Sequence, residues 1–89
     1  MTNQEIESAI AGIYQKAFRL CCYVNEATTL GDDDRDALHE AIGQIVVLGG
    51  GCEEAFEQGR NADAVELICH PSTRDLLDYT GLFLEQNNA

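Results

Sequence analysis

The sequence predicts an all-α protein, in which an antiparallel hairpin of two long helices is followed by two shorter helices to form a small helical bundle. Apolar residues recur at helical spacing through most of the chain. The one segment with strand propensity, Ile45 to Leu48, lies inside such a helical pattern. The 89 residues correspond to one domain, residues 1–89. A domain this small has a thin core, so a homodimer is a further expected source of stability.

The first helix is predicted over residues 3–28. Thr2 followed by Glu5 is a capping-box pattern, in which each side chain bonds the backbone of the other residue. The apolar positions that follow are spaced by alternating steps of four and three residues. They are Ile6, Ile10, Ile13, Ala17, Leu20, Val24 and Ala27.

Four further residues widen this apolar stripe: Tyr14, Phe18, Cys21 and Cys22. A broad stripe is typical of a helix that packs against more than one neighbour. Tyr14 and Phe18 are therefore either part of a wide core face or part of an exposed patch that docks a partner.

The second helix is predicted over residues 33–58, after a turn at residues 28–31. A run of aspartates opens it, where acidic side chains suit the positive end of the helix dipole. Gly49, Gly50 and Gly51 interrupt it with poor helix formers, yet the apolar pattern passes through them unshifted. We therefore expect one continuous helix. Its small residues should let the two backbones approach closely; these are Gly43, Gly49, Gly50 and Cys52.

Gly59 predicts the end of the second helix, because glycine readily adopts the left-handed conformation of a helix cap. A short helix is expected over residues 62–69 and ends before Pro71. Ser72, three residues before Asp75, predicts the cap of a last helix that runs to about residue 86. The apolar residues expected on this last helix are Leu76, Leu77, Tyr79, Leu82, Phe83 and Leu84.

The charge of the chain restricts its partners. Sixteen acidic residues against five basic ones give a formal charge of −11, which repels nucleic acids and anionic membranes. Neither a secretory signal nor an apolar run long enough to span a membrane is evident. The sequence therefore predicts a cytoplasmic protein, in its own cell or in a host, that binds neither nucleic acid nor membrane directly.

The sequence predicts no catalytic residues, no metal site and no cofactor. The four cysteines have no CxxC spacing and are interpreted as reduced thiols, mostly on apolar helix faces. His39 is expected on the surface, and His70 is expected to bond the terminal carbonyls of the helix that it ends. A small enzyme or a metal-binding protein remains a remote alternative.

The leading functional hypothesis is a small acidic inhibitor or regulator that engages a basic surface of a partner protein. In composition the chain resembles small phage-encoded inhibitors, including nucleic-acid mimics and anti-CRISPR proteins. The alternative is a helical dimerisation or adaptor module that docks a regulator through apolar contacts. The candidate partner-binding residues are Asp32, Asp33, Asp34, Asp36, Glu53, Glu54, Glu57, Tyr14 and Phe18.

Overall fold

The computed structural model describes the backbone of residues 1–27 and 30–87, and the side chains of residues 1–27 and 30–81. Within these residues the chain forms four helices and no strand, in an elongated shape of 44 × 23 × 20 Å. The helices are α1 (Asn3–Glu26), α2 (Asp32–Glu57), α3 (Asn61–Cys69) and α4 (Pro71–Asn87). The predicted fold class is confirmed. Part of the predicted turn, residues 28 and 29, lies outside the described residues.

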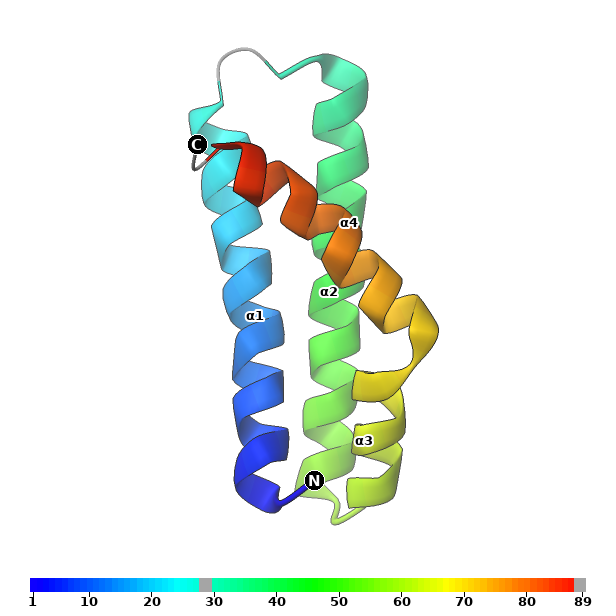
Figure 1. Cartoon of the computed structure of the whole chain (residues 1–89). Helices are drawn as coiled ribbons and strands as arrows, with labels where there is room; N and C mark the ends of the chain where they lie inside the picture. The colour runs from blue at the N-terminus through cyan, green and yellow to red at the C-terminus, as the bar shows by residue number, and fades with distance from the viewer. Residues whose placement is uncertain (28–29, 88–89) are drawn as a thin grey trace.

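Helices α1 and α2 lie side by side and antiparallel, and together they form the long axis of the molecule (Figure 1). The predicted seam of α1 is its buried face from Ile6 to Val24, whereas its last predicted position, Ala27, is the half-buried C-cap of the helix. Helix α2 contributes the facing row, in which Leu38, Ile45 and Cys52 are completely buried. Burying apolar side chains along this seam is the main stabilising contribution to the hairpin.

Helix α2 is continuous through Gly49–Gly51, as predicted. Gly49 is buried, and a Cβ atom there would lie 3.1 Å from two carbons of the Tyr14 ring and 3.3 Å from Cγ2 of Ile13. Packing against α1 therefore stabilises a helix that the glycines alone would weaken. The prediction for Gly43 was wrong: a Cβ atom there would meet nothing within 4 Å.

The start of α1 and the end of α2 are both capped. Thr2 and Glu5 form the predicted capping box at the start of α1. At the end of α2, Gly59 has a φ of 78°. The amide of Arg60 donates to the carbonyl of Ala55, and the amide of Gly59 donates to that of Phe56. This pair of bonds is a Schellman motif, which satisfies the last carbonyls of the helix.

Arg35, the fourth residue of α2, caps the end of α1. Its guanidinium donates to the carbonyls of Val24, at 2.8 Å, and Ala27, at 3.1 Å. Helix α1 has no basic residue in its own last turn, so this contact places the positive charge that the helix dipole favours there. Sequence spacing gave no sign of this contact, because it joins the start of α2 to the end of α1 and its C-cap residue, Ala27.

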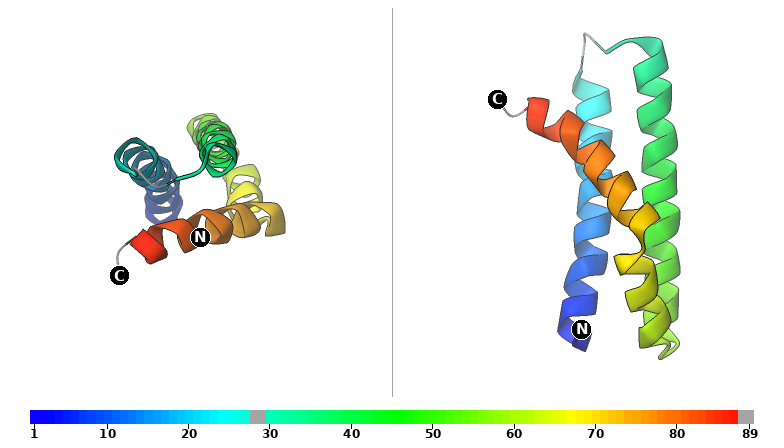
Figure 2. Two further views of the ribbon diagram at one scale, coloured as in Figure 1. Left: turned by 90° about the horizontal axis from the view of Figure 1, so that it is seen from above. Right: turned by 45° about the vertical axis from the view of Figure 1, so that its right-hand side comes forward.

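Helices α3 and α4 cover one face of the hairpin, and α4 crosses it obliquely (Figure 2). The roles expected at their junction were wrong. Helix α4 begins at Pro71 rather than after Ser72, and His70 accepts a 3.1 Å hydrogen bond at Nδ1 from the amide of Ser72. The imidazole thus caps the start of α4 rather than the carbonyls of α3, and proline suits the first helical position because it has no amide hydrogen.

Two threonines lie in the buried face of α4. Thr73 Oγ1 donates to the carbonyl of Leu67 at 2.7 Å, and the completely buried Thr80 donates within its own helix to Leu76 and Leu77. Neither position was predicted to be buried, because threonine has a polar side chain. Tyr79, expected in the apolar face, is 45% exposed. The side chains of Leu82, Phe83 and Leu84 lie outside the described residues.

Candidate functional site

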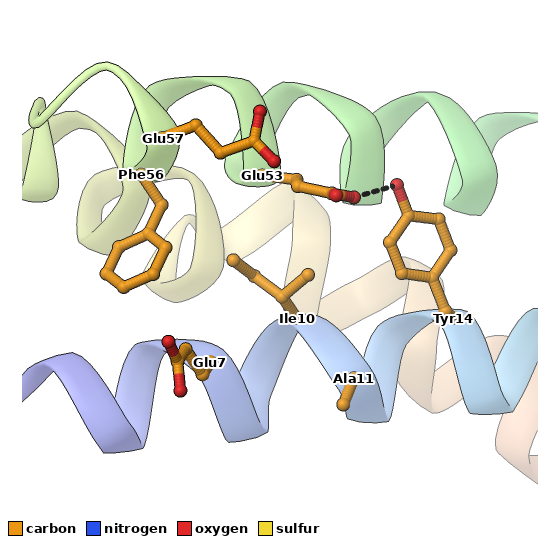
Figure 3. Close-up of a pocket in the computed structure, with 7 residues that line it drawn as sticks. All are labelled: Glu7, Ile10, Ala11, Tyr14, Glu53, Phe56 and Glu57. Atoms are coloured by element: carbon orange, nitrogen blue, oxygen red, sulfur yellow. Dashed lines mark hydrogen bonds between the residues drawn. The ribbon is translucent and has the colours of Figure 1, made fainter.

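A groove with a volume of about 410 Å³ opens between α1 and α2 near the carboxyl end of α2 (Figure 3). Its floor is apolar and aromatic, and three carboxylates border it. We refer to it as the α1–α2 groove; its lining residues are Glu7, Ile10, Ala11, Tyr14, Glu53, Phe56 and Glu57. An apolar floor with a few charged groups at its border is the usual make-up of a binding site.

Tyr14 spans the groove from one helix to the other. Its hydroxyl donates a 3.0 Å hydrogen bond to Oε2 of Glu53 (Figure 3). The ring lies against Gly49, where a Cβ atom would be 3.1 Å from two ring carbons and the ring would have to shift to make room for it. The glycine therefore sets the position of the tyrosine, and the tyrosine orients one of the three carboxylates.

We expect Tyr14 to titrate at a higher pH than an ordinary tyrosine. The hydrogen bond to Glu53 raises its pKa above 10.0, and desolvation and the negative charges of Glu53 and Glu57 act in the same direction. The stability from this shift is fully present below the pKa of the unfolded chain, and is lost as the pH rises through the higher folded-state pKa. Tyrosinate absorbance measures the titration, with Tyr14→Phe identifying the signal.

Glu53→Gln should return the pKa of Tyr14 toward its ordinary value, because an amide oxygen carries no charge. Glu54→Gln is the matched control, since Glu54 is not among the groove residues and accepts a bond from Gln58 instead. An unchanged Tyr14 titration in Glu53→Gln would show that the hydrogen bond does not form in solution.

Apolar surface continues the groove toward the middle of the hairpin. Phe18 is 69% exposed and Val46 is 46% exposed. Phe18 lies one turn after Tyr14 in α1, and Val46 lies two turns before Glu53 in α2, so both share the helix face of the groove. Phe18 is therefore surface and not core, while Tyr14 is half-buried. Exposed aromatic and aliphatic side chains next to a groove are typical of protein-interaction surfaces.

The predicted partner-binding residues separate into two groups, except for Glu54, which lies in the last turn of α2 but outside the groove. The structure brings Tyr14, Glu53 and Glu57 together in the groove, with Phe18 beside them. The aspartates of the other group, Asp32, Asp33, Asp34 and Asp36, lie at the opposite end of α2, about 30 Å away at 1.5 Å per residue. They do not belong to the same site.

Four groove residues were missed by the sequence analysis: Glu7, Ile10 as a lining residue, Ala11 and Phe56. Glu7 and Ala11 precede Tyr14 by seven and three residues, so the helical repeat places them on the face of Tyr14. That repeat was a usable signal. The position of Phe56 and Glu57 across the groove from these residues could not be predicted, because it depends on how the two helices align.

The helix dipole distinguishes the two acidic groups. Asp32, Asp33 and Asp34 occupy the first turn of α2, where negative charge is favourable and where the N-cap Gly31 offers no side-chain bond. Glu53 and Glu57 lie near the end of the same helix, where the dipole disfavours negative charge and the last turn has no basic residue. Negative charge thus favours the start of α2 at the aspartates and opposes local stability at Glu57.

The cysteines and histidines do not form a metal-binding group in the part of the chain that the structure describes. All four cysteines are free, and Cys52 is completely buried, which raises the pKa of its thiol. His39 is exposed. No group of three or more metal-binding side chains is found in the described residues, and no helix among them has the length and apolar character needed to cross a membrane. Comparison of the chain with models of protein families, with curated proteins and with solved structures gives no match.

Proposed function

We propose that this protein binds another protein, and that the α1–α2 groove with its apolar extension receives a basic segment of that partner. The observation that carries the proposal is the combination of Glu7, Glu53 and Glu57 with an apolar floor in one groove. A lysine or arginine side chain fits such a groove, since its aliphatic part packs on apolar surface while its charge meets carboxylates. Binding there would inhibit or regulate the partner by covering its basic surface.

The net charge of −11 supports the same proposal, because it speeds the encounter with a basic partner. A nucleic-acid mimic would also present carboxylates to a basic protein. The apolar floor between these carboxylates favours a peptide segment over a phosphate-binding surface. The four free cysteines fit a reducing compartment, so we propose the cytoplasm of the protein's own cell or of a host as its location.

A docking module driven by apolar contact is the second candidate, including self-association of two copies. Phe18, Val46 and the 75% exposed Val47 support it. Salt distinguishes the two, because a complex of opposite charges weakens steeply as ionic strength rises, whereas an apolar complex changes little.

We expect Glu57→Gln to weaken binding of the partner without lowering the stability of the free protein. Glu57 borders the groove, and its charge is unfavourable at the end of α2. The test captures binding proteins on immobilised wild-type, Glu57→Gln, Phe18→Ser and Glu54→Gln chains. A specific partner should be basic, should be released by salt, and should be reduced on the first two variants. Thermal unfolding followed by circular dichroism measures stability.

Glu54→Gln is the matched control, because Glu54 lies in the same last turn of α2 but outside the groove. It should retain the partner as the wild type does. Equal capture on all four chains would refute the groove as the binding site. Loss on Phe18→Ser alone, with no effect of salt, would favour the apolar docking module.

A further inference from the structure

Among the residues that the structure describes, α3 and α4 cover one face of the hairpin formed by α1 and α2. On that face, Lys16 Nζ donates to the carbonyl of Leu77 in α4 at 3.3 Å, and a Cβ atom at Gly51 would lie 3.8 Å from Leu67 in α3. Figure 2 shows α3 and α4 on this same side of the pair. The α1–α2 groove opens on the opposite side, with α3 and α4 behind the two long helices (Figure 3), and no helix of the described residues covers it there. A further helix laid there would complete a second layer.

Two rows of side chains border this open face, and both run along the helix axes. Glu7, Ala11, Tyr14 and Phe18 form the row of α1, and Val46, Gly50, Glu53 and Glu57 form the row of α2. Each row has steps of four, three and four residues and extends about 16 Å. A helix lying between them would meet both rows with its own residues at the same steps.

An extended segment fits this face less well than a helix does. Helices α1 and α2 use their backbone amides and carbonyls internally, so they offer no hydrogen bonds to an extended backbone. A helical segment satisfies its own backbone and needs only side-chain contacts. The open face therefore selects for a partner that is already helical or that folds on binding.

The face also has a direction. Its three carboxylates, Glu7, Glu53 and Glu57, lie at one end, and exposed Phe18 and Val46 lie toward the middle of the hairpin. Tyr14 lies between the two regions, where its hydroxyl donates to Glu53 and its ring lies against Gly49. Charge complementarity thus places the basic residues of an occupant at one end and its apolar residues at the other.

We infer that the occupant is an amphipathic helix of the partner protein that carries basic residues near one end and apolar residues up to about three turns further along the same face. The basic residues lie between Glu7, Glu53 and Glu57, and the apolar residues cover Phe18 and Val46. This inference rests on the proposed function and specifies its ligand. Basic residues at the amino end of the occupant fit best, because the positive end of its helix dipole then also faces the carboxylates.

Fluorescence anisotropy with two labelled synthetic peptides of about 18 residues, or five turns, tests the inference. The block peptide has arginines on one face of its amino-terminal half and leucines on the same face of its carboxyl-terminal half. The mixed peptide has the same composition, with arginine and leucine alternating along that face. We expect the block peptide to bind about tenfold more tightly, a difference of about 1.4 kcal/mol. Glu57→Gln and Phe18→Ser should each weaken its binding, and Glu54→Gln should not.

A third peptide, the block sequence with a central proline, tests the helical conformation, because proline disrupts a helix interior. It should bind weakly. Equal binding of the proline peptide, or of the mixed peptide, would overturn the inference while leaving the proposed function intact if Glu57→Gln still weakens both. Failure of all three peptides, with a captured partner that depends on the groove, would likewise overturn only the helical occupant. Binding that no groove substitution affects would overturn the proposed function itself.

Discussion

Replacing Ile45 by alanine is expected to lower the free energy of unfolding by about 2–5 kcal/mol. The Ile45 side chain is completely buried between α1 and α2, so its truncation removes apolar contacts and leaves a cavity in the seam. A small domain has a total stability of about 5–15 kcal/mol, so a large share of it would be lost. Urea unfolding followed by circular dichroism measures the change.

Val47→Ala is the matched control, because Val47 lies two residues further along the same helix and is 75% exposed. It should have little effect or slightly raise stability, since alanine is the better helix former. Similar losses for the two variants would mean that Ile45 is not in the core, and would contradict the alignment of the hairpin.

Replacing Gly49 by valine is expected to destabilise the protein by about 1–3 kcal/mol, the usual range for overpacking. The new side chain would begin 3.1 Å from the Tyr14 ring and 3.3 Å from Ile13, so the ring or the helix must move. Movement of the ring would also break the hydrogen bond from Tyr14 to Glu53. The pKa of Tyr14 should therefore fall toward its ordinary value, and partner binding in the groove should weaken.

The matched control is Gly43→Val, six residues earlier in α2, where a Cβ atom would meet nothing within 4 Å. Gly43→Val should leave stability unchanged or raise it by a few tenths of a kcal/mol, because valine forms helix better than glycine. Equal destabilisation by the two substitutions would show that the effect comes from valine in a helix and not from contact with Tyr14. Urea unfolding measures the change in stability, and the tyrosine titration measures the change in the pKa of Tyr14.

Much of the fold follows from local patterns. The steps of four and three residues from Ile6 to Val24 predicted the buried face of α1, because a helix returns to one side at that interval. Thr2 and Gly59 predicted helix ends, since their capping chemistry involves only nearby backbone. Patterns of this kind failed at Thr73 and Thr80, whose hydroxyls find partners on carbonyls of the fold.

The candidate site could be predicted only in part. Sequence reasoning identified Tyr14, Phe18, Glu53 and Glu57 as interaction residues, and the structure places three of them in one groove with the fourth beside it. It also included Glu54, which lies outside the groove, and the aspartates at the start of α2, which lie at the far end of the hairpin. Charge can be read from residue type, but distance between residues of different helices cannot.

By itself the sequence determined the helices, their apolar faces and the acidic character of the surface, because propensity, periodicity and charge belong to single segments of the chain. The tertiary structure alone decided which residues of α1 meet which residues of α2. It placed Tyr14 over Gly49 and beside Glu53, and it set Arg35 at the end of α1. The alignment of two helices depends on side-chain packing across their whole contact, so no single segment contains it.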